Sequence, residues 1–219
     1  MTLPDIDIRT AAVTFLAIVI SLTVHEFAHA FTADRLGDDT PRRHGRLTLN
    51  PIVLFRAYPF GSLVVPLIGA FSGFLAGWAA TPVNPSRVRR TISVRTADIL
   101  ITIAGPLSNV LLAMISTGLF ALLMAFGAGQ AWAEPLISLT TYLVLSNVFI
   151  AMFNLVPIPP LDGFQIVRAL APESGLLRFL QQYQLFVLIL FIFYAGRLFH
   201  PVIGAAMRVL ATVAVGVTG

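Results

Sequence analysis

Long apolar runs constrain the fold of this chain more than any other feature of its sequence. Several of them provide the roughly 20 residues of helix that cross a hydrocarbon layer about 30 Å thick. Of the 219 residues, 57% are hydrophobic and only 11% are charged, against roughly 25% charged residues in an ordinary soluble domain. The sequence therefore predicts an all-α polytopic membrane protein in which residues 1–219 form a single integral-membrane domain.

About five of the apolar runs are expected to span the membrane as helices. They cover residues 11–31, 97–126, 136–156, 179–195 and 201–217. The first run is expected to continue to Leu36, where Gly37 is a suitable C-cap. Because the N-terminus lacks the basic start of a secretory signal, we expect this first helix to be retained.

The segment after the first helix carries two weaker patterns. Residues 45–50 alternate between apolar and polar side chains and include the β-branched Thr48, which predicts a short β strand before a turn. Residues 60–80 are apolar but rich in glycine, and they include Pro66. This composition is compatible both with a spanning helix and with a re-entrant segment that enters and leaves from one face.

The arginines favour the re-entrant alternative. Cytoplasmic loops of membrane proteins collect positive charge, and all the basic residues here are arginine. A re-entrant segment places the arginine-rich loops at 35–56 and 87–95 on one side, with the loop that holds Arg168 and Arg178. We expect this side to be cytoplasmic and the N-terminus to be outside. Since the arginines are scattered in loops, nucleic acid is not an expected partner.

The motif His25-Glu-Phe-Ala-His29 lies inside the first apolar run. A spacing of four residues puts both imidazoles on one face of a helix, where they can share a metal ion. Glu26 can then reach a metal-bound water without being a ligand, as in hydrolytic zinc sites. With no cysteine in the chain, any metal must use histidine, carboxylate or water as ligands. Ionisable residues in a membrane span indicate a functional interior.

Asp162 is the strongest candidate for a third ligand. It follows the prolines of the segment 157–160, which must break a helix at membrane depth. Irregular backbone is tolerated there only around a cavity or a buried site. An N-cap role for a helix that begins at Gly163 is the simpler alternative, and it is compatible with metal binding.

Together, His25-Glu-Phe-Ala-His29 and Asn154-Leu-Val-Pro-Ile-Pro-Pro-Leu-Asp162-Gly163 resemble the motifs of the site-2 protease family, the intramembrane zinc metalloproteases. Gly105-Pro106 with Asn109, and the segment 45–51, resemble the compact branch of that family, without PDZ or CBS domains. The resemblance implies that His25, His29 and Asp162 bind Zn²⁺ and that Glu26 is the general base. It implies for Asn154 a contact with the substrate carbonyl or oxyanion, for which helix packing is an equal alternative.

The resemblance also implies what the enzyme acts on and where. Its substrates would be membrane-anchored proteins cut within or near a transmembrane segment, as in regulated intramembrane proteolysis. Its location would be a prokaryotic plasma membrane, with the active site toward the cytoplasm. A substrate must unwind locally to be cut, and the expected strand at 45–50 could pair with it. The oligomeric state is not indicated.

Two segments depart from the family pattern, namely residues 52–59 and 77–82. They raise the expectation that substrate gating differs in this chain. Two other functions remain compatible with the motifs: a metal-binding transporter that uses the same three ligands, and an inactive scaffold that keeps the fold. The transporter alternative requires further polar residues along a path through the bilayer.

Overall fold

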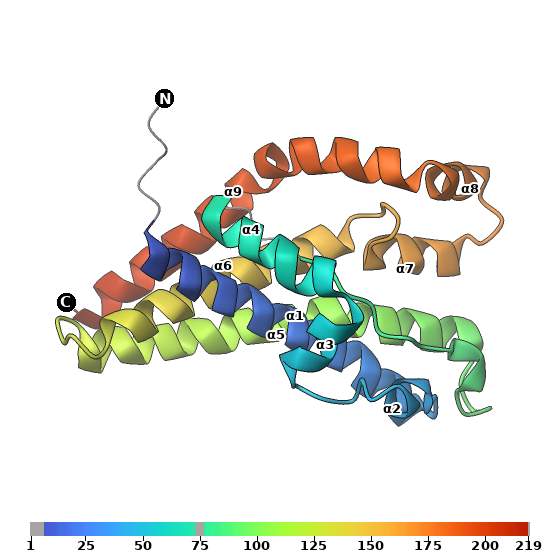
Figure 1. The fold of residues 1–219 in the computed structure, drawn as a ribbon, viewed down its shortest axis with the longest axis horizontal. Helices are drawn as coiled ribbons and strands as arrows, with labels where there is room; N and C mark the ends of the chain where they lie inside the picture. The colour runs from blue at the N-terminus through green and yellow to red at the C-terminus, as the bar shows by residue number, and fades with distance from the viewer. Residues whose placement is uncertain (1–6, 73–76, 219) are drawn as a thin grey trace.

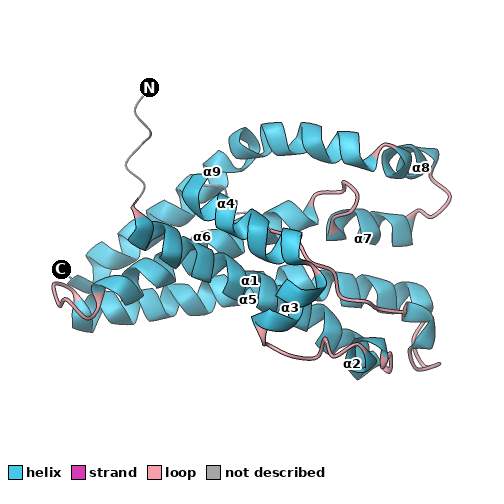
Figure 2. Cartoon of the chain, viewed as in Figure 1, coloured by secondary structure: helices cyan, strands magenta, loops and turns pink. Residues whose placement is uncertain are grey.

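The structure is a computed structural model that describes residues 7–72 and 77–218. Every regular element within these residues is helical (Figures 1 and 2). The elements are α1 (Ile8–Leu36), α2 (Thr40–Arg43), α3 (Pro51–Ala57), the π-helix η1 (Phe60–Val64), α4 (Val65–Ser72), the 3₁₀-helix η2 (Pro85–Arg87), α5 (Val94–Gly127), α6 (Glu134–Leu155), α7 (Asp162–Leu170), α8 (Gly175–Gln182) and α9 (Gln184–Thr218).

Four of the described helices, α1, α5, α6 and α9, are long and apolar enough to cross a membrane. The sequence predicts about five spans, with the runs 179–195 and 201–217 as separate helices. The structure joins most of both into α9, which contains Pro201 and bends along its length (Figure 1). A helix interrupted inside the hydrocarbon layer would leave backbone polar groups unpaired, so bending at a proline is the less costly solution.

Helix α1 matches the prediction for the first span. It begins after Asp7, whose side chain accepts a hydrogen bond from the Arg9 N–H, and it ends at the C-cap Gly37. Gly37 has a φ of 107°, which favours glycine, and its N–H bonds back to carbonyls of the last turn. The predicted C-cap is therefore confirmed.

The strand predicted at residues 45–50 is absent from the described chain. These residues form an irregular connection between α2 and α3. The reason is local: Asn50 accepts a hydrogen bond from the Ile52 N–H at 3.0 Å and caps α3, with Pro51 at the first helical position. The described residues also provide no neighbouring strand. The helix-start signal therefore outweighs the alternation of side chains.

Residues 60–72 are helical, and residues 77–84 are extended chain. The helical part, Phe60–Ser72, has 13 residues, a length of roughly 20 Å that is too short for a full crossing. On the return, the Trp78 N–H donates to the Gly61 carbonyl at 2.9 Å, so the chain is again beside its starting point. This geometry supports the re-entrant interpretation; residues 73–76 lie outside the described part.

The proline-rich segment ends α6 and places α7. Helix α6 stops at Leu155, residues 156–161 are irregular with a cis Pro159–Pro160 bond, and α7 begins at Asp162. Asp162 is thus the first residue of α7, not its N-cap, which is Leu161. The predicted break is confirmed. An aromatic cluster of α6 and α9 packs beside it; its closest ring pairs join Phe149, Phe153, Phe191 and Phe199.

We predict that Gly163→Ala destabilises the fold around α7. A Cβ at Gly163 would lie 2.5 Å from the Leu155 carbonyl carbon and 2.6 Å from the Val156 oxygen, both backbone atoms that cannot rotate away. Overpacking of this kind costs about 1–3 kcal/mol, measurable as a lower midpoint of thermal unfolding in detergent. The matched control is Gly118→Ala in α5, where a Cβ meets nothing within 4 Å. An unchanged midpoint for Gly163→Ala would contradict the packing described here.

Candidate active site

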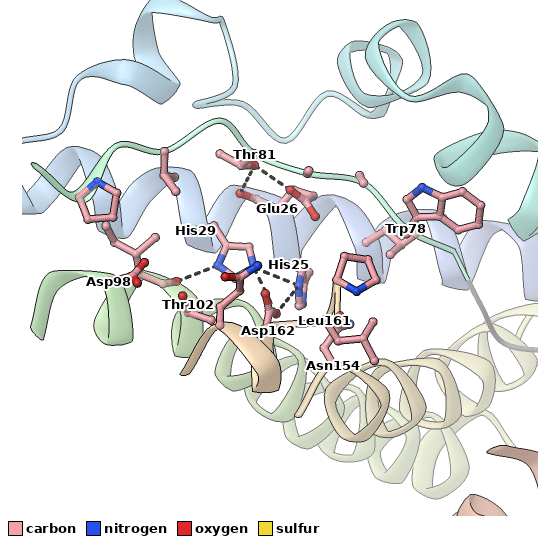
Figure 3. A pocket seen from close by; sticks show the side chains of 18 of the residues that line it. His25, Glu26, His29, Trp78, Thr81, Asp98, Thr102, Asn154, Leu161 and Asp162 are labelled. Atoms are coloured by element: carbon pink, nitrogen blue, oxygen red, sulfur yellow. Dashed lines mark hydrogen bonds and ion pairs between the residues drawn. The ribbon is translucent and has the colours of Figure 1, made fainter. Parts of the chain in front are cut away.

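Three predicted ligands meet at one point inside the bundle (Figure 3). His25 and His29 project from one face of α1, and Asp162 approaches from the start of α7. The two Nε2 atoms lie 3.1 Å apart, and Asp162 Oδ2 lies 3.2 Å from that of His25 and 3.4 Å from that of His29. The fold therefore brings together side chains separated by more than 130 positions in the sequence.

Helix α5 supplies a hydrogen-bond acceptor to the Nδ1 atom of each imidazole. His29 Nδ1 lies 2.7 Å from the Ile101 carbonyl oxygen, which can only accept, so this nitrogen carries a proton and donates it. His25 Nδ1 lies 2.6 Å from Asn109 Oδ1 in the same arrangement. With the proton on Nδ1, the Nε2 atom of each ring presents a lone pair toward Asp162. Such contacts orient histidine ligands in metal sites.

The donor set fits a zinc ion. Asp162 Oδ2 is buried, and it has no hydrogen-bond donor. Two imidazole lone pairs and a carboxylate oxygen at about 3 Å from one another repel unless a cation lies among them. Ligands of a tetrahedral zinc at roughly 2.0–2.1 Å are about 3.3 Å apart, which matches the three separations. The set of two nitrogens and one oxygen leaves a fourth position for water or substrate.

A glycine lets α5 approach this closely. A Cβ on Gly105 would lie 2.5 Å from His29 Cε1 and 2.7 Å from His25 Cε1. Any larger residue would push the two imidazoles away from Asp162. The surface packed against Gly105 therefore consists of the predicted ligands themselves.

Asn109 has a more direct role than the sequence indicated. Its oxygen accepts a hydrogen bond from His25 Nδ1, while its amide group donates to Asn147 Oδ1 at 2.7 Å and to the Ser21 carbonyl at 3.2 Å. Asn147 in turn donates to Ser21 Oγ at 2.8 Å. Both asparagines are fully buried. Asn147 was missed, although an amide within an apolar run is a usable signal.

Glu26 is 5% exposed and lies beside the ligands without joining them. Its carboxylate accepts a hydrogen bond from Thr81 Oγ1 at 2.7 Å. Thr81 comes from the extended chain that crosses α1 in Figure 3. Sequence reasoning missed this residue. The only signal was a hydroxyl in Gly77-Trp-Ala-Ala-Thr-Pro82, one of the two segments that differ from the family pattern.

The ligands and Glu26 line a cavity of about 510 Å³. Its walls come from α1, the start of α5, the proline break with α7, and the extended chain after the re-entrant helix. The residues lining it include Leu22, Trp78, Thr81, Asp98, Thr102, Asn154, Gln165 and Arg168. Residues 45–50 are not among them, and the pairing of that segment with a substrate stays a prediction.

Asn154 lines the cavity and also bonds within its own helix. Its amide group donates to the Ile150 carbonyl at 3.0 Å, one turn back in α6. This contact is the helix-packing alternative, and it uses one of the two amide protons, so the other stays available to a carbonyl or oxyanion in the cavity. Both alternatives for Asn154 are therefore compatible with the geometry.

Comparison with known proteins decides the family. The model of peptidase family M50 matches residues 121–195, a stretch that includes Asp162. A zinc metalloprotease by name, YwhC of Bacillus subtilis, is 38% identical over 162 residues, which cover 73% of this chain and 69% of YwhC. The chain belongs to the M50 family, the site-2 proteases. It is accordingly a zinc metalloprotease of the site-2 type and an integral membrane protein.

Two mycobacterial relatives, both named Rip2 and described as zinc metalloproteases, agree with this assignment. Rip2 of Mycolicibacterium smegmatis is 34% identical over 166 residues, and Rip2 of Mycobacterium tuberculosis H37Rv is 33% identical over 160 residues. The matched part spans 60% and 56% of these two relatives. No solved structure matches the chain.

We predict that Asn109→Leu weakens zinc binding about 10- to 100-fold, the usual effect of losing an outer partner of a metal-bound histidine. Leucine has a similar size but cannot accept the proton of His25 Nδ1. Competition with a chromophoric chelator measures the affinity. Asn154→Leu is the control, because among the described residues Asn154 hydrogen-bonds to its own helix and not to a ligand, and its zinc affinity should stay near wild type. Equal affinities for wild type and Asn109→Leu would contradict the positioning role.

Proposed function

We propose that this chain hydrolyses peptide bonds within or near transmembrane segments of membrane-anchored proteins, as in regulated intramembrane proteolysis. One observation carries the proposal: His25, His29, Asp162 and Glu26 line a single cavity inside a bundle of membrane-length helices. A peptidase site at that position acts on chains that are themselves in the membrane. Residues 1–219 then serve as one integral-membrane peptidase domain.

His25 Nε2, His29 Nε2 and Asp162 Oδ2 would hold the zinc ion. When bound, zinc lowers the pKa of its water to about 7 and polarises the scissile carbonyl. Glu26 takes the proton of the attacking water and delivers it to the leaving amine. Its burial strengthens these interactions, because charges interact more strongly in a protein interior than in water. Asn154 can donate its other amide proton to the substrate carbonyl.

The shape of the cavity favours a protease over a metal transporter. Its lining on α1 begins at Leu22 and runs toward the arginine-rich end, and no described residue between 103 and 153 lines it. The buried polar groups beyond it, Ser21, Asn109 and Asn147, bond to one another. Among the described residues, the cavity lining thus stops at the level of Leu22 and does not extend along the rest of α1.

We predict that Glu26→Gln abolishes cleavage of a membrane-anchored model substrate while the zinc content stays normal. Glutamine keeps the size of the side chain but cannot take a proton. Asp162→Asn should weaken zinc binding, because it removes the anionic ligand. Purified protein in detergent, assayed for zinc and for cleavage, measures both. Glu173→Gln, at an exposed position, is the control and should behave as wild type. Cleavage by Glu26→Gln would refute the mechanism.

The arginines support a cytoplasmic site in a prokaryotic plasma membrane. In Figure 1, α2, the start of α5 and the α7–α8 region lie at one end of the bundle, and the α5–α6 turn lies at the other. Ten of the 14 basic residues belong to the first end. They are Arg35, Arg42, Arg43, Arg46, Arg87, Arg89, Arg90, Arg95, Arg168 and Arg178. By helical rise, His29 lies on the order of 10 Å inside this boundary.

This orientation predicts opposite labelling of two single-cysteine variants. The chain has no cysteine of its own, so labelling has no background. Gln130→Cys, in the exposed α5–α6 turn, should react with a membrane-impermeant maleimide added to intact spheroplasts. Thr91→Cys, exposed before α5, should react only after the membrane is permeabilised. The reverse pattern would show that the proposed topology is inverted.

A further inference from the structure

An extended segment, residues 77–85, crosses α1 beside Glu26 (Figure 3). We call this segment the strap. It has no helix until η2 begins at its end. Most of its residues line the cavity. At its start, Trp78 is tied to the re-entrant helix through the Gly61 carbonyl. The strap therefore forms a wall of the site that is separate from the four long helices.

At its far end the strap is tied to α1, the helix that carries Glu26. Asp38 follows the C-cap of α1 and is completely buried. Its carboxylate accepts the Asn84 N–H at 2.5 Å and the Thr40 N–H at 3.0 Å. Just beyond the strap, the Arg89 N–H donates to the Leu36 carbonyl at 2.9 Å. A buried carboxylate that accepts backbone N–H groups is a strong, specific anchor.

A salt bridge outside the cavity adds to this anchor. Arg87, in η2, lies 3.1 Å from a carboxylate oxygen of Asp39. Asp39 also accepts from Arg43, and this hydrogen bond, helped by the two guanidinium charges, lowers the pKa of the Asp39 carboxyl. The pair is solvent-exposed, so it contributes less than Asp38. Both contacts nevertheless keep the strap in a constant position relative to α1.

Between these anchors, Thr81 contacts Glu26 twice. Its hydroxyl lies 2.7 Å from Glu26 Oε2 and 3.1 Å from the Glu26 carbonyl oxygen. A hydroxyl has one proton to donate, and the shorter distance and the charge favour the carboxylate. Glu26 has no other side-chain hydrogen bond within residues 7–72 and 77–218. Its second carboxylate oxygen is therefore left unpaired.

We propose that Thr81 is a positioning residue for Glu26: its hydroxyl holds Oε2 and leaves the other oxygen available to accept a proton. The role of Glu26 as base rests on the proposed function, whereas the contact itself does not. A glutamate side chain has several rotamers, and a base must lie within hydrogen-bond reach of its proton. Because the strap is anchored at Asp38, Thr81 holds the carboxylate in one orientation before substrate arrives.

Infrared spectroscopy tests the contact without any substrate. The chain has three glutamates, Glu26, Glu134 and Glu173, so carboxyl-¹³C-glutamate labelling with subtraction of a Glu26→Gln spectrum isolates the Glu26 band. Thr81→Val keeps the shape of threonine but removes the hydroxyl. We expect it to shift the antisymmetric carboxylate stretch of Glu26, and we expect Thr81→Ser to leave the stretch as in wild type. An identical band in wild type and Thr81→Val would overturn the proposal.

Kinetics test the consequence for turnover. With a membrane-anchored model substrate, Thr81→Val should lower kcat roughly tenfold, as expected for losing a hydrogen bond to a charged group, with KM and zinc content near wild type. Thr81→Ser should restore kcat. A raised KM with unchanged kcat would mean that Thr81 only fixes the strap, and it would overturn the positioning role. If wild type cleaves nothing, the proposed function fails, while the infrared result still decides whether Thr81 holds Glu26.

Discussion

Burial of ionisable side chains in an apolar helix is the constraint on which the rest of this structure depends. His25, Glu26 and His29 all lie within α1 and are almost inaccessible. Each must have a partner, because an unpaired polar group in hydrocarbon costs several kcal/mol. Helix α5 supplies partners for the two Nδ1 atoms, and the strap supplies one for Glu26. The two Nε2 atoms and Asp162 Oδ2 remain without a hydrogen-bond donor. A cation bound among them would satisfy all three.

The interruptions of the helices follow from the same constraint. The chain is irregular at membrane depth in the proline break before α7 and in the strap, and both segments line the cavity. Elsewhere the helices continue, even through Pro106 and Pro201. Backbone that is not helical is therefore found where polar groups and the cavity can satisfy it. The apolar outer surfaces of α5 and α9 are suited to lipid.

The sequence allowed prediction of the parts of the site that depend on local spacing. The i,i+4 histidines and the proline break at Asp162 follow from helix geometry and from proline chemistry, and so does the cap at Gly37. Thr81 and Asn147 could not be found in this way, because their partners are distant in sequence. The predicted strand at 45–50 is absent because Asn50 caps α3 and no other described segment offers a strand to pair with it. The described chain has four membrane-length helices instead of about five, because α9 continues through residues 196–200, which separate the last two apolar runs.

The pairing of α1 with α5 has one more consequence, which concerns assembly. The helices run antiparallel, so Ile101 meets His29 while Asn109 meets His25 two turns further along. Gly105 lies between these contacts, against both rings. A slide of one helical turn, about 5.4 Å, would separate both hydrogen-bonded pairs and put a residue other than Gly105 against the imidazoles. The site can thus form in a single register of the two helices, and metal binding reports that the chain has inserted and paired correctly.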